Sequence, residues 1–164
     1  MPYTRTTWQD FPNTTTPITA ARLNNSEAFL ASISTIADAW TSYTPTLTNC
    51  TSPITVAKYS QVGKSVQFYV VLTLTGAQVS GLIGVSLPVA CSAAMSGGFE
   101  ALIYRPSALA IYPAIAYTGT TSRLDLYAQN AAGTYVVHTA TSSTVPITFA
   151  SADIIYVAGQ YESV

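Results

Sequence analysis

The sequence predicts a helix from Pro17 to Trp40, and it predicts no helix in the segments before and after. Thr16 can accept a hydrogen bond from a free N–H of the first turn, Pro17 suits the first helical position, and Thr19 offers a second start. An isolated helix of this length is only marginally stable in water, so its apolar side chains need a surface to pack on. That surface is either a β domain of the same chain or the same helix in other copies of the chain.

Apolar residues recur along this helix with the spacing of a coiled coil. Leu23, Leu30 and Ala37 are each seven residues apart, and a second set follows three residues after them. This pattern of a and d positions extends over about three heptads. We favour association between copies, because the helix lies between an aperiodic arm and a complete β-rich segment. The predicted neck residues are Leu23, Leu30, Ile33, Ala37 and Trp40.

Charged residues make up 8% of the chain, against roughly 25% in ordinary globular proteins. Thr, Ser and Tyr are abundant instead, which predicts an uncharged, hydroxyl-rich surface suited to an oligomer or a particle-bound protein. With a formal net charge of −1 and an isoelectric point near 5.6, the chain lacks the basic field that binds nucleic acid, so we expect no nucleic-acid partner. No apolar run approaches the ~20 residues of a membrane span, and the N-terminus lacks the apolar core of a secretory signal. We therefore expect no membrane insertion.

From Tyr43 onward the apolar residues alternate as they do in strands. Lys64–Thr75 is the clearest example, because its alternate residues are apolar and its other face is mixed rather than charged. Such a mixed face is typical of a strand whose outer side meets a neighbour. The apolar face of this strand consists of Val66, Phe68, Val70, Leu72 and Leu74. Further strands are predicted at Ile54–Ser60, Leu82–Leu87, Phe99–Tyr104, Ala108–Tyr117, Arg123–Gln129, Thr134–Thr141, Ile147–Phe149 and Asp153–Tyr161.

Short strands with regular turn signals between them, and no second helix, indicate a β-sandwich of the jelly-roll type. The chain is therefore predicted to be mainly β. It has an extended arm over residues 1–16, a helical neck over residues 17–40 and a β-sandwich knob over residues 41–164.

Three aromatic residues, Tyr3, Trp8 and Phe11, interrupt the polar arm at spacings that fit neither a helix nor a strand. Such side chains either tuck back onto the body of their own chain or insert into a partner as anchors. We favour a partner, and we predict these residues as the docking contacts of the arm.

Cys50 and Cys91 lie far apart in the sequence, and neither belongs to a CxxC pair. They are either joined as a disulfide between neighbouring strands or kept as buried thiols. We favour buried thiols, because free cysteine packs as a small apolar residue.

The groups that catalysis needs are sparse. His138 is the sole histidine and lies on a predicted strand, where a lone imidazole is usually a packing or surface residue. No two carboxylates form a recognisable hydrolytic pair, and the sequence contains no G-x-S-x-G motif or phosphate-binding loop. We expect no enzyme activity, no metal and no cofactor; the alternative, a polysaccharide-cleaving enzyme, would need an acidic cleft.

Binding is the function class that remains. The β region carries tyrosines and planar polar side chains near turns, which are residue types that hold sugars, although tyrosines in strands more often serve packing. The candidate ligand-binding residues are Tyr117, Arg123, Tyr127 and Asn130.

Several phrases of the sequence resemble bacteriophage tail proteins and fibres. PITAARLNNSE, residues 17–27, is similar to a phrase common near the N-termini of those proteins. WTSYTPTLTN, residues 40–49, resembles the entry into their C-terminal β domain. YSQVGKSVQF, residues 59–68, resembles one of their strand–turn–strand units, and AGQYE, residues 158–162, resembles their final strand.

This resemblance implies a homotrimeric appendage on the surface of a phage virion. The N-terminal arm would dock on a structural protein of the tail or capsid, the helix would form a coiled-coil neck, and the knob would face outward to bind a bacterial surface polysaccharide. The alternative is a head fibre or capsid decoration protein with a mainly structural role.

Overall fold

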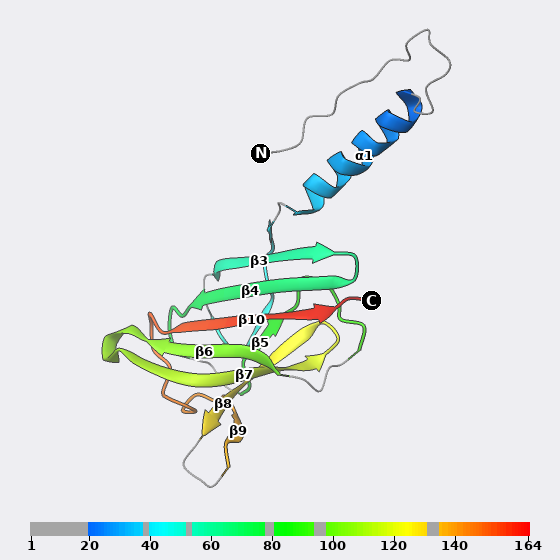
Figure 1. The fold of residues 1–164 in the computed structure, drawn as a ribbon. Helices are drawn as coiled ribbons and strands as arrows, with labels where there is room; N and C mark the ends of the chain where they lie inside the picture. Colours follow the sequence, from blue (N-terminus) through cyan, green and yellow to red (C-terminus); the bar gives the residue numbers. More distant parts are fainter. Residues whose placement is uncertain (1–19, 38–39, 52–53, 78–80, 94–97, 131–134) are drawn as a thin grey trace. The chain divides into compact units, whose positions relative to one another are not determined.

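A computed structural model describes residues 20–37, 40–51, 54–77, 81–93, 98–130 and 135–164. The chain divides into two units, Met1–Ala39 and Trp40–Val164. The first unit contains a single described helix, α1 (Ala20–Ala37), and the second is built from β-strands (Figure 1). The predicted mainly β class with one N-terminal helix is confirmed.

The strands of the second unit are joined in one antiparallel sheet (Figure 1). They are β1 (Thr41–Ser42), β2 (Leu47–Thr48), β3 (Ile54–Val62), β4 (Ser65–Thr73), β5 (Gly84–Ser86), β6 (Phe99–Arg105), β7 (Ala110–Thr120), β8 (Arg123–Asn130), β9 (Val137–Ala140) and β10 (Ile154–Glu162). The hydrogen-bonded order is β1-β3-β4-β10-β6-β7-β8-β5-β2, and β9 pairs with β8 beyond the end of β5. A single turn of 3₁₀ helix, Pro106–Ala108, links β6 to β7.

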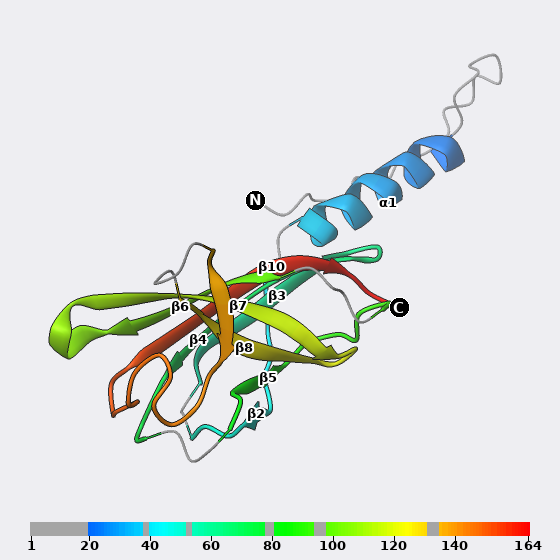
Figure 2. The ribbon, with the colours of Figure 1, turned by 90° about the horizontal axis from the view of Figure 1, so that it is seen from below.

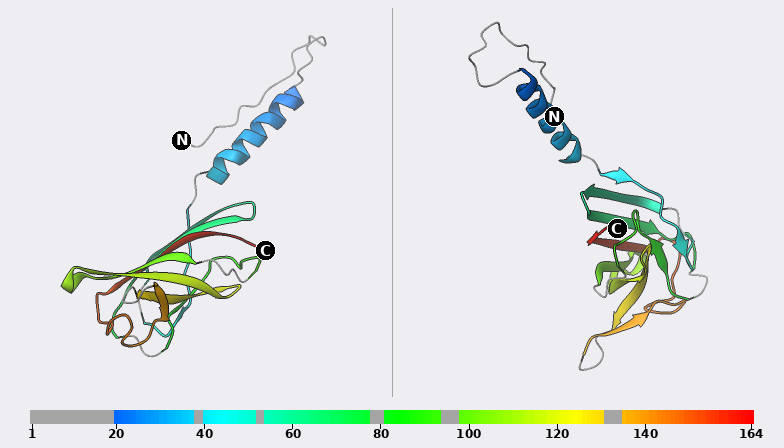
Figure 3. Two further views of the ribbon diagram at one scale, coloured as in Figure 1. Left: turned by 60° about the horizontal axis from the view of Figure 1, so that its bottom comes forward. Right: turned by 90° about the vertical axis from the view of Figure 1, so that its right-hand side faces the viewer.

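The sheet is strongly curled because the strands at its two ends, β1 and β2, follow each other directly in the chain. β1 and β2 lie at opposite ends of the strand path, yet only residues 43–46 connect them. The chain from Ser42 to Leu47 spans at most about 18 Å, whereas nine flat strands would separate the two ends by about 38 Å. The sheet therefore has to bend until its ends approach each other, and it forms a half-barrel (Figures 2 and 3).

Hydrogen bonds attach the connecting segment to both ends of the sheet. The N–H of Tyr43 donates to the carbonyl of Ala57 on β3 at 3.1 Å, and the N–H of Ser86 on β5 donates to the carbonyl of Thr46 at 3.0 Å. The predicted sandwich needs two separate stacked sheets, whereas the described strands form this single curled sheet. The mainly β prediction holds, but the arrangement of its strands differs from the one predicted.

Most predicted strands are observed within a few residues of their expected bounds. Ile147–Phe149 is the exception, because it belongs to no strand, although Phe149 is buried in the core. The two short strands β1 and β2 were not predicted.

The core lies on the concave side of the half-barrel. The predicted inward face of β4 is confirmed, because Val66, Phe68, Val70, Leu72 and Leu74 are all buried. At one end of this core the rings of Phe68, Phe99 and Tyr161 pack edge to face, with centroids 5.6–6.3 Å apart. Gly159 lies under this cluster, because an added Cβ there would come within 2.3 Å of Cδ1 of Phe99.

Both cysteines are free and buried, which agrees with the buried-thiol alternative. Burial raises the pKa of the Cys50 thiol to about 11. A thiol with so high a pKa remains protonated and unreactive at neutral pH.

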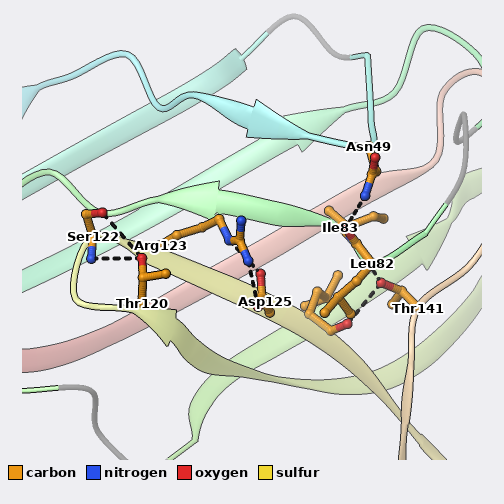
Figure 4. Close-up of polar contacts among 9 residues, drawn as sticks. Asn49, Leu82, Ile83, Thr120, Ser122, Arg123, Asp125 and Thr141 are labelled. Atoms are coloured by element: carbon orange, nitrogen blue, oxygen red, sulfur yellow. Dashed lines mark hydrogen bonds and ion pairs between the residues drawn. The ribbon is translucent and has the colours of Figure 1, made fainter.

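Thr141 lies where the neighbour of β8 changes from β5 to β9 (Figure 4). Its hydroxyl donates to the carbonyl of Leu126 at 2.9 Å and accepts from the N–H of Ile83 at 3.1 Å. The residue is buried, so the bond from Ile83 satisfies a buried backbone N–H at this position. The carbonyl of Leu126 also accepts from the N–H of Thr141 at 3.2 Å, so both the side chain and the backbone of Thr141 bind to β8.

Within α1, the side chains at positions 21–31 are exposed or half-buried, and none is buried. Leu30 is 48% exposed. Trp40, which was expected to end the helix, instead begins the β unit, where its ring lies 5.2 Å from that of Tyr69.

Candidate functional site

A group of aromatic side chains lies on the outer surface of the sheet, over β7, β8 and β9. The ring centroids of Tyr117 and Tyr127 are 5.4 Å apart, and those of Tyr117 and His138 are 5.6 Å apart. The Tyr117 hydroxyl and Nδ1 of His138 are joined by a hydrogen bond of 2.5 Å. We call Tyr117, Tyr127 and His138 the aromatic cluster. His138 is exposed, and the two tyrosines are half-buried, so each ring has a part that a ligand can reach.

The sheet register explains why these residues meet. Tyr117 on β7 is directly opposite Asp125 on β8, and Tyr127 lies two residues further along the same face. His138 is opposite Gln129 on the β8–β9 pair, so it shares that face as well. A cross-strand diagonal of this kind is within the reach of aromatic side chains.

Arg123 and Asp125 form an ion pair beside the aromatic cluster (Figure 4). Nε of Arg123 donates to Oδ1 of Asp125 at 2.8 Å, and Nη2 donates to Oδ2 at 3.1 Å. Gly119, at the irregular pairing between β7 and β8, makes room for the carboxylate, because a Cβ there would come within 2.0 Å of Oδ2 of Asp125. The Arg123 side chain is 40% exposed. Since a guanidinium has five N–H donors, it keeps donors for a ligand after both bonds to Asp125 are made.

An open hollow of about 460 Å³ lies next to the cluster on the outer surface. Glu100, Pro113, Ile115 and Gln129 are among the residues that line it, so its wall combines apolar surface with one carboxylate and one amide. Together with the aromatic cluster, the hollow offers flat rings and planar hydrogen-bonding groups on one surface. This combination suits a neutral ligand rich in hydroxyl groups.

The sequence-predicted ligand residues are only partly brought together. Tyr117, Arg123 and Tyr127 share one face, whereas the alternation of β8 places Asn130 on the opposite face from Tyr127. Asn130 instead lines a second hollow with Thr139, Val145 and Pro146. Sequence reasoning treated His138 only as a packing or surface residue and did not connect it with Tyr117.

The other predicted sites fall elsewhere. Tyr3, Trp8 and Phe11 of the arm lie outside the described residues. Leu23, Leu30, Ile33 and Ala37 of the neck lie in α1.

Among the residues that the structure describes, no group of three His, Cys, Asp or Glu side chains is placed to hold a metal ion. No helix among the described residues is both long and apolar enough to cross a membrane.

Comparison with known proteins gives no relative from which a function could be transferred: no family model, no curated protein and no solved structure matches the chain.

Proposed function

We propose that this chain is a homotrimeric fibre protein of a bacteriophage virion. In this proposal the N-terminal arm docks on a tail or capsid protein, α1 forms a three-stranded neck, and the β unit attaches to a bacterial surface polysaccharide. The order of arm, helix and β unit supports it, as do the phrases that resemble phage fibres.

The observation that carries the proposal is the exposure of α1. Its described side chains are not buried, and Leu30, at a central a position of the heptad pattern, is half exposed. An isolated helix of 18 residues is only marginally stable in water, so its apolar stripe needs a surface to pack on. Identical helices from other copies, with the same a and d positions, are the partners that this spacing fits.

The polysaccharide part of the proposal is supported by the aromatic cluster and the ion pair beside it. A neutral polysaccharide offers apolar C–H faces to the rings and hydroxyl groups to the planar polar side chains. The low charge of the chain, 8% of its residues, agrees with a surface that recognises such a ligand without a strong electrostatic field.

Leu30→Asp is expected to convert the full chain from a trimer into a monomer. A carboxylate at an a position would be buried among apolar side chains in the neck, and an unpaired buried charge is strongly unfavourable. Light scattering measures the change: the wild type should show three times the chain mass of 17.3 kDa, and the variant one chain mass. Near-UV circular dichroism should show the β unit still folded in both.

Ala28→Asp is the matched control, because Ala28 is exposed and lies at the f position of the preceding heptad, away from the neck seam. This variant should remain a trimer. A monomeric wild type, or a Leu30→Asp variant that keeps the trimer mass, would contradict the proposed neck.

His138→Ala and Tyr127→Ala are each expected to weaken binding to purified bacterial cell-wall polysaccharide by at least about ten-fold, because aromatic side chains dominate such contacts. Tyr135→Ala is the control, since Tyr135 is 81% exposed but is not part of the aromatic cluster. Equilibrium binding of the trimer measures the effect. Absence of binding by the wild type, together with normal incorporation into particles, would favour the mainly structural head fibre or decoration protein.

A further inference from the structure

A row of apolar side chains crosses five neighbouring strands on the outer surface of the sheet. The register places Val56 of β3 opposite Val71 of β4, Val71 opposite Tyr156 of β10, Tyr156 opposite Leu102 of β6, and Leu102 opposite Pro113 of β7. We call these five residues the outer row. All are exposed or half-buried, and Tyr156 is 38% exposed. Figure 1 shows the five strands side by side in this order.

An antiparallel sheet with one solvated face normally alternates between apolar and polar residues. Here the inward residues are buried in the core, and the outward face is mixed, but its five residues in the outer row are all apolar or aromatic. Contiguous apolar surface of this kind marks a surface that another protein covers. The mixed outer face that the sequence predicted for β4 continues over its four neighbours.

The charges beside the outer row indicate what covers it. The next row along the strands runs from Lys58 on β3 through Tyr69 and Ala158 to Glu100 on β6. The row continues to Ile115 on β7. It therefore carries one cation on β3, the first of the five strands, and one anion on β6, next to the last of them. Neither takes part in an ion pair among the described residues, whose two ion pairs join Arg105 to Asp153 and Arg123 to Asp125.

A surface with opposite charges toward its two sides is complementary to another copy of itself. In a closed cyclic assembly, the Lys58 side of one copy can meet the Glu100 side of the next. The position of Trp40 also indicates that another copy of the chain covers this surface. It continues the heptad pattern of the predicted neck, and its ring lies against Tyr69 on this outer surface. Only residues 38–39 separate it from the end of α1, at most about 11 Å of chain.

We infer that the outer row and the two charged residues beside it form the contact between β units of neighbouring copies, with Lys58 of one copy paired to Glu100 of the next. The inference rests on the proposed homotrimer and names the part of the β unit that completes it. The aromatic cluster, over β7 to β9, contains no residue of this contact. The hollow beside it shares Glu100 and Pro113 with the contact, so in the assembled trimer the ligand is left with the aromatic cluster and the Arg123–Asp125 pair.

Carbodiimide cross-linking of the full chain tests the inference, because this reagent joins an amine to a carboxylate only where the two are in contact. Lys58 and Lys64 are the lysines of the sequence, so few links can form. The wild type should give covalent dimers and trimers on a denaturing gel. Lys58→Gln and Glu100→Gln should each lose these bands. Lys64→Gln is the matched control, because Lys64 lies in the exposed turn between β3 and β4, and this variant should keep them.

Light scattering on the same samples separates the two proposals. A trimer whose cross-links are absent, or persist in Lys58→Gln, overturns this inference and leaves the proposed trimer intact. A monomeric wild type overturns the proposed trimer, and the inference falls with it.

Discussion

Replacing Gly159 with alanine is expected to lower the free energy of unfolding of the β unit by about 2 kcal/mol. A Cβ at this position would come within 2.3 Å of Cδ1 of Phe99, which real side chains do not tolerate. Phe99 cannot easily move aside, because it is buried and packed against Phe68 and Tyr161. Overpacking of a core costs about 1–3 kcal/mol, which outweighs the gain of about 0.4–1 kcal/mol that alanine brings by restricting the unfolded chain.

Thermal unfolding should detect this loss as a decrease in Tm of about 4–8 °C. Gly76→Ala is the matched control, because nothing lies within 4 Å of a Cβ at that position. Its Tm should stay the same or rise slightly. Phe99→Leu should relieve the clash, so the double variant should be more stable than the sum of the two single effects predicts. An additive double variant, or a Gly159→Ala variant as stable as Gly76→Ala, would show that the clash is not the cause.

The pattern of alternating residues located most strands but could not decide how the strands pair. Alternation identifies which face of β4 is buried, because the period of two is a property of the strand alone. Sandwiches and curled sheets contain similar strands, and only the pairing order distinguishes them. That order depends on β1 and β2, which are two residues long and flank Pro45, too short to give a periodic signal.

The candidate site was only partly predictable, because the sequence shows which residue types are present but not how the strands that carry them pair. Tyr117 and Tyr127 were recognisable as residue types suited to a ligand, but their contact depends on the β7–β8 register. His138 reaches Tyr117 from β9, a strand more than ten residues further along the chain, and nothing in its own neighbourhood of the sequence indicates that contact. Asn130 is a candidate from the sequence because it is a planar polar residue that, with Arg123, bounds one predicted strand near the turns. Its spacing of three residues from Tyr127 in a strand places the two on opposite faces.

Asp153→Asn is expected to destabilise the β unit by about 2 kcal/mol at neutral pH, since hydrogen bonds to a charged group contribute about 1.5–3 kcal/mol. The buried carboxylate accepts from Nε and Nη2 of Arg105 at 3.0 and 2.7 Å, and from the N–H of Ala150 at 2.9 Å. The asparagine amide can accept through its oxygen alone, so its NH₂ group would face donors.

The contacts of Asp153 with Arg105 and Ala150 also make its contribution to stability dependent on pH. Burial by itself would raise the pKa of Asp153, but the hydrogen bonds from Arg105 and Ala150 and the charge of Arg105 hold that pKa below its usual value of 3.8. A carboxyl whose pKa is lower in the folded than in the unfolded state stabilises the fold fully above the unfolded value. That contribution is lost as the pH falls below about 3.8 and through the folded pKa. The stability difference between wild type and Asp153→Asn should therefore be largest at neutral pH and shrink in acid.

Urea unfolding at neutral pH and at about pH 2.5 measures that difference. The low charge content of the chain makes the result easy to interpret, because Asp and Glu together number only seven. Glu162→Gln is the matched control, since it removes a carboxylate at an exposed position of β10, and it should change stability little at either pH. If Asp153→Asn destabilised the β unit equally at both pH values, its effect would arise from packing and not from the ionised carboxylate. If it caused no loss at neutral pH, the contacts of Asp153 with Arg105 and Ala150 would not contribute to stability.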